Sequence, residues 1–403
     1  MAKKDKLMIL AFSAVPFIMV LGNSMLIPEF PQIKKALDIS QFRVGLLITT
    51  FSITAGITIP FLGYLSDQIG RKKVVVPSLI IYGLGGVICG SAAILLENPY
   101  KIILVGRAVQ GLGAAGTAPI VMAWIGDIFQ SEKRSEVLGI IEAANGVGKV
   151  TSPILGSIVG LISWVALFFF YAILSIPIAA GVYIWGEEGE INNSGNFKKY
   201  LQQIKKILKE KGLSLLSTIL AGMLVLFILF GLLSYFSDIL ETDFKIKGVV
   251  KGLVIALPIL FMSITSYING VVLKKINKYF KIAINIGLAA VLFSLVGLNF
   301  FNQQLTAYLI LFSIIGIGTG LVLPAVNTLV TSSTKSEQRG IVTSVYGSAR
   351  FIGVALGPPA FSFMEGLSLP TMYLGGSAIT FVVLIVTFIF IKEKGMKPPE
   401  KSS

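Results

Sequence analysis

Three polar side chains recur at helical spacing inside an otherwise apolar stretch of the chain. Glu142, Asn145 and Lys149 lie three and seven residues apart, so a helix would place them on one face. An enclosed carboxylate can bind and release protons when burial and nearby cations act on it in opposite directions. Glu142 is therefore the candidate proton-coupling residue. The alternative is a fixed ion pair of Glu142 with Lys149 or an arginine, which would only hold helices together.

These residues must be positioned by membrane helices, because the whole chain is unusually apolar. Of its 403 residues, 54% are hydrophobic and only 13% are charged, and its mean hydropathy is +0.84. A soluble protein would carry about a quarter charged residues. Apolar runs reach the roughly 20 residues that a membrane-spanning helix needs, which is longer than the strands of a β-barrel. The fold class is therefore predicted to be an all-α integral membrane protein.

Twelve membrane spans are predicted from these apolar runs. They cover residues 8–27, 44–66, 74–96, 101–125, 136–161, 163–185, 213–237, 249–273, 281–300, 304–330, 339–364 and 369–391. The longest polar connection, 186–212, divides the chain into an N-terminal half, 1–185, and a C-terminal half, 213–403 with a short tail. Six spans are expected in each half.

The basic residues indicate the orientation in the membrane. Lys and Arg concentrate at the two ends of the chain and in every second connection, so both termini and the linker 186–212 are predicted to be cytoplasmic, in the cell membrane. In the linker, Phe197, Leu201, Ile204 and Leu208 recur at helical spacing between lysines. This pattern predicts a basic amphipathic helix on the inner leaflet. A solvated tether is the open alternative.

Composition also excludes several kinds of site. The chain has one cysteine and no histidine, so an intrachain disulfide and histidine-based metal sites are excluded. The net charge of +14 follows membrane topology and does not indicate nucleic acid binding. No cofactor or metal is expected, and the predicted partners are the lipid bilayer, protons and a small-molecule substrate.

An internal repeat relates the two halves at a constant offset of 205 residues. Gly111, Gly113, Pro119, Gly148 and Pro153 correspond to Gly316, Gly318, Pro324, Gly353 and Pro358. The halves are therefore predicted to be parallel copies, with the substrate site at their interface near the middle of the membrane. The glycines are interpreted as positions where helices approach closely, and not as a phosphate-binding loop.

Four motifs carry a resemblance to a known family. They are the loop Gly63–Lys73 (GYLSDQIGRKK), Leu104–Gly113 with its central arginine, Gly139 with Gly148, Ser152, Pro153 and Gly156, and Leu26–Pro28 with Pro31. With these motifs and its repeat, the chain resembles the major facilitator superfamily, and within it the twelve-span drug:proton antiporters. The resemblance implies two pseudo-symmetric bundles of six helices. In the third motif, Ser152-Pro153 and Gly156-Ser157 replace the usual Gly-Pro and Gly-Gly pairs.

The resemblance also implies roles for motif residues. Arg107 is expected to take part in proton transfer, although hydrogen bonding between helices remains open for it. Gly139, Gly148, Pro153 and Gly156 are expected to bend span five at the interface of the halves, because a proline removes a helical hydrogen bond.

A substrate cavity is expected between the halves. The residues assigned to it are Asn23, Asn145, Lys149, Tyr346 and Arg350. Arg350 equals Asn145 plus 205, so the repeat places the two at matching depths. Contact of Arg350 with substrate and pairing of Arg350 with Glu142 both remain open, and Lys149 could neutralise Glu142 or meet an anionic substrate group.

The loop at Gly63–Lys73 is interpreted as a cytoplasmic gate formed by Gly63, Asp67, Gly70 and Arg71. Asp67 lies one helical turn after Gly63, where its carboxylate could meet the positive end of a helix from the other half. In the second copy Lys274 stands in the place of Asp67, so the latch is predicted on one side only.

The predicted function is a proton-coupled efflux antiporter for small amphipathic compounds or drugs, working as a monomer by alternating access. A dedicated siderophore or metabolite exporter, a lysolipid flippase and a proton-coupled importer are the alternatives. An enzyme is not expected, because the chain offers no catalytic set. No glycine-rich ATP-binding loop is present, and no ring of charges indicates a channel.

Overall fold

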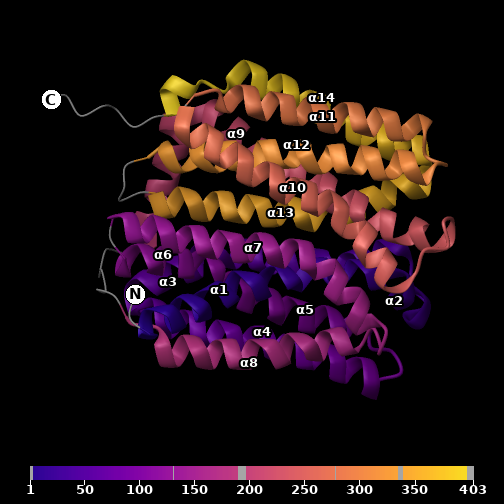
Figure 1. The fold of residues 1–403 in the computed structure, drawn as a ribbon, viewed down its shortest axis with the longest axis horizontal. Coiled ribbons are helices and arrows are strands. Elements are labelled where there is room, and N and C mark those ends of the chain that lie inside the picture. Colours follow the sequence, from indigo (N-terminus) through magenta and orange to yellow (C-terminus); the bar gives the residue numbers. More distant parts are fainter. Residues whose placement is uncertain (1–2, 130, 189–196, 277, 335–338, 397–403) are drawn as a thin grey trace. The chain divides into compact units, whose positions relative to one another are not determined.

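The computed structural model describes residues 3–129, 131–188, 197–276, 278–334 and 339–396. These residues form helices joined by short turns, and the helices of each part of the chain lie alongside one another (Figure 1). The prediction of an all-helical protein is confirmed for the described residues.

The first part of the chain forms eight α-helices and one short 3-10 helix. They are α1 (Lys3–Ser24), η1 (Ile27–Glu29), α2 (Phe30–Leu37), α3 (Gln41–Ile69), α4 (Arg71–Leu95), α5 (Tyr100–Ala115), α6 (Ala118–Ile128), α7 (Ser131–Gly160) and α8 (Ala166–Trp185).

The second part contains six α-helices and a 3-10 turn. They are α9 (Phe197–Thr242), α10 (Gly248–Ile276), α11 (Phe280–Phe300), α12 (Leu305–Ser332), α13 (Arg339–Leu367), α14 (Leu369–Phe390) and η3 (Glu393–Met396).

Eleven stretches of described helix are long and apolar enough to cross a membrane. Each of the eleven falls on one of the twelve predicted spans. The predicted span without such a stretch is 136–161, which lies in the 30-residue helix α7. Helix α7 has the length to cross, but its polar side chains and glycines, including Glu142, Asn145 and Lys149, lower its hydropathy below that of the other spans.

Two spans differ from the prediction by an irregular turn within them. The first continues past 8–27 through η1 and α2, so that the helical stretch covers Lys4–Leu37. The fourth is broken into α5 and α6 near Gly116, because Pro119 stands in the first turn of α6 and has no N–H to continue the hydrogen bonds of α5. In both places the irregular backbone adjoins buried side chains of the same part of the chain.

The chain divides into two compact units. Unit 1 comprises Met1–Ser194 and Phe236–Ala256, and unit 2 comprises Gly195–Tyr235 and Leu257–Ser403. The chain therefore passes between units inside α9 and again inside α10. The segment Phe236–Ala256, here called the α9–α10 hairpin, belongs to unit 1.

Closely packed glycines join the helices within each unit. In unit 1 a Cβ at Gly111 would collide with the backbone of Phe51 on α3, and one at Gly113 would collide with α4. In unit 2, Gly316 and Gly318 meet α10 and α11 in the same way. The interpretation of these glycines as close-approach positions is confirmed, and the two pairs are 205 residues apart, as the repeat predicts.

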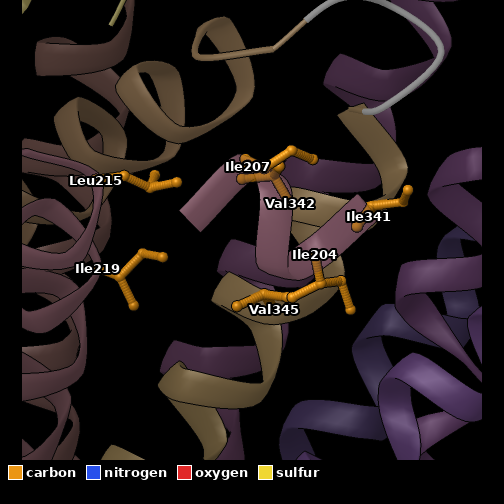
Figure 2. Close-up of a pocket in the computed structure, with 7 residues that line it drawn as sticks. All are labelled: Ile204, Ile207, Leu215, Ile219, Ile341, Val342 and Val345. Atoms are coloured by element: carbon orange, nitrogen blue, oxygen red, sulfur yellow. The ribbon is translucent and has the colours of Figure 1, made fainter. Parts of the chain in front are cut away.

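The predicted linker helix is present as the first part of α9. It ends at Gly212, whose φ of 51° and ψ of −140° interrupt the helix before the membrane span begins. Figure 2 shows Ile204 and Ile207 of this helix beside α13, whose side chains Ile341, Val342 and Val345 line the same pocket. The helix therefore packs part of its apolar face against α13 within unit 2. The side chains of the other linker positions, Phe197, Leu201 and Leu208, lie outside the described residues. The same holds for the side chain of Lys274, which was compared with Asp67 in the predicted gate.

Candidate transport site

The side chain of Arg107 on α5 is completely buried within unit 1. Its Nε donates to the carbonyl of Leu47 at 3.0 Å, its Nη1 to Gln110 Oε1 at 2.6 Å and its Nη2 to Asn23 Oδ1 at 2.8 Å. The guanidinium carbon lies 4.5 Å from the centre of the Phe51 ring. All hydrogen-bond partners of Arg107 in the described part of the chain are neutral. This is the arrangement expected of an arginine that holds helices together.

Asn23 extends the network of Arg107 to a third helix. It lies near the end of α1, is 6% exposed, and donates from Nδ2 to Ser52 Oγ on α3 at 2.7 Å. Tyr82 and Tyr171 donate to the carbonyls of Ile18 and Leu21 at 3.1 and 3.3 Å. The end of α1 is thus fixed by polar contacts from α3, α4, α5 and α8. Asn23, which was assigned to the substrate cavity, is a buried member of this network.

Glu142, Asn145 and Lys149 lie on one continuous helix, α7, as the spacing predicts. Glu142 is exposed, whereas Asn145 and Lys149 are half-buried. Among the described residues Glu142 forms no ion pair. The alternative of a fixed pair between Glu142 and Lys149 is therefore not supported by the described side chains. The Oδ1 atom of Asn145 is buried and has no hydrogen-bond partner among the described residues. This face therefore carries an exposed carboxylate and a buried amide oxygen without a hydrogen-bond partner among the described residues.

The antiporter-motif residues divide by what they contact. A Cβ at Gly148 would meet Phe17 and Val20 of α1, and one at Gly156 would meet the backbone of Met25. Gly139 has nothing within 4 Å. Two of the motif glycines therefore let α7 approach α1 and the residue that follows it, and Pro153 lies between them inside the helix. The bend at Pro153 stays a prediction.

The predicted gate residues gather at the junction of α3 and α4. Arg71 forms an ion pair with Asp67 one turn earlier, and its Nε lies 3.0 Å from Asp127 Oδ2. Its Nη1 also donates to Ser66 Oγ at 2.7 Å, and Ser66 in turn donates to the carbonyl of Gly63. Arg71 thus joins Asp67, Asp127 and Ser66 inside unit 1.

Gly70 makes the junction between the two helices possible. Its φ of 107° is one that residues with a side chain rarely adopt, and it lets α4 begin with only this one residue between it and the end of α3. The carboxylate of Glu188 lies against Gly70 and accepts from the backbone N–H of Lys72 at 3.3 Å. The motif therefore has a local structural role, beside any role in gating.

Tyr346 and Arg350 lie one turn apart on α13, in unit 2. The Arg350 guanidinium is 5.7 Å from the centre of the Tyr346 ring. Tyr346 is 2% exposed, its ring packs on Gly222 of α9, and its hydroxyl has no hydrogen-bond partner among the described residues. The structure brings these two residues together. It places them in a different unit from Glu142, Asn145 and Lys149.

One buried acid was missed by reasoning from the sequence. Glu29 in η1 is 1% exposed, although the predicted first span ended at residue 27 and left this acid in a loop. The signal was available, since Glu29 stands between Pro28 and Pro31 directly after an apolar run, where a turn folded back into the protein can bury it. Its carboxyl group lies near Lys251 and Glu241 of the α9–α10 hairpin.

Unit 2 contains a cluster of buried tyrosines that the sequence did not predict. Tyr308 and Tyr373 share a hydrogen bond between their hydroxyls at 2.7 Å, and the Tyr235 and Tyr373 rings lie 6.4 Å apart. These residues join α9, α12 and α14.

Comparison with known proteins identifies the family to which this arrangement belongs. Residues 12–358 match the model of the Major Facilitator Superfamily, and a second match covers residues 286–402. The chain belongs to the Major Facilitator Superfamily. The resemblance in its motifs is thereby confirmed, and this major facilitator is a multi-pass integral membrane transporter and not an enzyme.

Two characterised relatives come from Bacillus subtilis strain 168. A bacillibactin exporter is 43% identical to this major facilitator over 357 residues, which are 88% of this chain and 89% of the exporter. Multidrug resistance protein 2 is 26% identical over 390 residues, which are 94% of each chain.

Solved structures agree in fold. A D-xylose-proton symporter superposes with a TM-score of 0.76 over 96% of this chain and 99% of its own, at 14% identity. A bacterial homologue of the human lysosomal transporter Spinster, in an inward-facing and unoccupied conformation, gives a TM-score of 0.74 over 97% and 96%, at 16% identity. The predicted major facilitator fold is confirmed.

Proposed function

We propose that this major facilitator exports a siderophore of the bacillibactin kind from the cytoplasm in exchange for protons. The observation that carries the proposal is its 43% identity to a bacillibactin exporter along nearly the full length of both chains. Among the functions considered from the sequence, this favours the dedicated siderophore exporter over the general efflux pump.

Glu142 is the carboxylate proposed to carry the coupled proton. Its exposure and the absence of an ion partner among the described residues support this role, because a group that must load and release protons has to be accessible. Asn145 and Lys149 on the same face are proposed as substrate contacts, with Tyr346 and Arg350 contributed by unit 2. The neutral partners of Arg107 support a positioning role, in which it orients Asn23 and the end of α1.

Alternating access is the proposed transport cycle. Substrate enters from the cytoplasm, the two halves reorient around it, and a proton bound from outside returns the carrier to its starting state. The distribution of Lys and Arg supports cytoplasmic termini in the cell membrane.

Uptake into everted membrane vesicles tests the proposal. Vesicles with an acidic interior should accumulate bacillibactin only when they contain this protein, and a protonophore should abolish the accumulation. Glu142→Gln should remove the dependence on the proton gradient. Glu136→Gln, at another exposed position of the same helix, is the matched control and should transport normally. Accumulation no greater than in vesicles without the protein would reject the proposed substrate.

A broad drug exporter is the second candidate, favoured by the match to Multidrug resistance protein 2 over 94% of both chains. The same vesicles distinguish the two candidates. Efflux of ethidium without movement of bacillibactin would support the drug exporter.

A further inference from the structure

The carboxyl group of Glu29 is enclosed by unit 1. Glu29 is 1% exposed, and its Oε2 atom is buried with no hydrogen-bond partner among the described residues. The group lies directly against Gly160 at the end of α7, where a Cβ would collide with it. An ionised carboxylate in such a place costs several kcal/mol unless a cation compensates it. The charge state of Glu29 therefore affects the stability of this region.

Compensation for Glu29 must come from the α9–α10 hairpin. Lys251 of the hairpin is 1% exposed, but its Nζ already donates to Glu241 Oε2 at 2.6 Å. Lys251 and Glu241 are the charged groups that act on Glu29. Two carboxylates thus share one ammonium group, which leaves one carboxylate in surplus.

The other charged groups nearby do not balance this surplus. Lys34 of α2 is already paired with Asp238 of the hairpin. Helix α7 has no titratable residue after Lys149, and η1 and the end of α1 contribute none besides Glu29. The remaining charged residues of the hairpin, Asp243, Lys245 and Lys247, are exposed.

Polar contacts and close helix packing hold the hairpin against the rest of unit 1. Ser237 Oγ donates to the carbonyl of Ile27 at 2.6 Å, in addition to the pair between Lys34 and Asp238. Gly252 lies against Pro153 and Ser157 of α7, where a side chain would not fit. The contact of Ser237 is made in η1, two residues before Glu29. A change of charge at Glu29 therefore acts where the hairpin docks.

We propose that Glu29 is a proton-binding group that controls the docking of the α9–α10 hairpin. Protonated Glu29 leaves the enclosed cluster neutral and stabilises the docked hairpin. Ionised Glu29 adds an uncompensated negative charge and favours release. Because α9 and α10 continue into unit 2, release of the hairpin is linked through the chain to unit 2. This assignment deepens the proposed proton coupling and takes its place in the transport cycle from that proposal.

The sign of the pH dependence follows from these charges. Docking is complete in acid, where Glu29 is protonated, and weakens as the pH rises and the proton is lost. A single linked proton changes the docking equilibrium by at most about tenfold per pH unit.

Thiol accessibility tests the assignment without a substrate. Cys89 is replaced by Ser, and the single change Ser237→Cys places a thiol in the docking contact, where the native side chain is fully buried. The rate of its alkylation by a membrane-impermeant maleimide is measured on intact cells across a pH series. Gln303→Cys, at an exposed position between α11 and α12, corrects for the ionisation of thiols.

The expected result is a corrected rate that rises with pH, by up to about tenfold per unit. Glu29→Gln should give a low rate at every pH, and Glu29→Asp should restore the rise. Glu241→Gln should flatten the dependence, because Lys251 can then pair with ionised Glu29. Gly252→Val should give a fast rate at every pH, since a side chain there prevents docking.

Two results would overturn the assignment. One is a pH dependence in Glu29→Gln equal to that of the unchanged protein. The other is a flat, low rate in the unchanged protein while Gly252→Val reacts fast. If bacillibactin is not transported but the rate follows Glu29, the proposed function fails alone. If transport is proton-coupled and the rate is flat, only the role of Glu29 fails.

Discussion

At the scale of single residues, the buried guanidinium of Arg107 is costly to remove. Arg107→Ala leaves the oxygens of Leu47, Gln110 and Asn23 without their donor. Each buried unsatisfied group costs about 1–3 kcal/mol. We expect a clear fall in the melting temperature in detergent, which Arg107→Lys repairs only in part because an ammonium lacks the planar fork of donors.

The exposed Lys206 provides the control for this change. Its nearest acid, Glu210, lies 3.8 Å away, and such surface pairs contribute about 0–1 kcal/mol. Lys206→Ala should leave the melting temperature almost unchanged. An Arg107→Ala protein as stable as Lys206→Ala would contradict the structural role of the arginine.

Residue types and spacing predicted the polar face of α7 but not the surroundings of its members. The shared face of Glu142, Asn145 and Lys149 follows from helical geometry alone. The burial of Glu29 does not, because it depends on Gly160 of α7 and on a hairpin more than two hundred residues away. Likewise, the sequence marked Arg107 as important, whereas its neutral partners come from three separate segments.

At the scale of helices, some glycines lie where two helices touch and others lie where there is open space. Replacing one glycine of each kind by alanine tests the difference. Gly111→Ala should destabilise the protein by about 1–3 kcal/mol, because the new methyl group collides with the backbone of α3. A Cβ at Gly146 on α7 would have nothing within 4 Å. Gly146→Ala should therefore stabilise the protein by up to about 1 kcal/mol, because alanine has the higher helix propensity. Thermal unfolding measures both. Equal shifts in the same direction would contradict the described packing.

The junction of α3 and α4 leads to a kinetic prediction. Asp67→Asn weakens the hold on Arg71, which Asp127 and Ser66 then retain. We expect turnover to slow by roughly tenfold, or ~1.4 kcal/mol in the barrier, with substrate binding nearly unchanged. Transport rates and equilibrium binding of bacillibactin measure the two effects. A large loss of affinity would instead place Asp67 in the binding site.

Helix existence was predictable from hydropathy, whereas helix ends were not. The extension of the first span through α2 and the break between α5 and α6 depend on irregular turns at Ile27 and Gly116. Such turns survive inside a membrane protein only where neighbouring side chains bury them. That information lies in the tertiary contacts and not in local hydropathy.

At the scale of the whole molecule, the sequence predicted two halves related by a repeat. The contacts of Gly111 and Gly316 agree with that relation. The division into compact units nevertheless falls inside α9 and α10, because Ser237 and Asp238 contact residues 210 and 204 positions earlier in the chain. No local pattern marks contacts between residues so far apart.

The central proposal for the whole molecule is that it exchanges a siderophore for protons through Glu142. The direct measurement is the proton flux that bacillibactin triggers in energised everted vesicles, followed with a pH-sensitive dye. We predict that adding bacillibactin releases protons from vesicles with the unchanged protein or Glu136→Gln, and not from vesicles with Glu142→Gln. Bacillibactin movement without proton flux, or an unchanged flux in Glu142→Gln, would contradict the account.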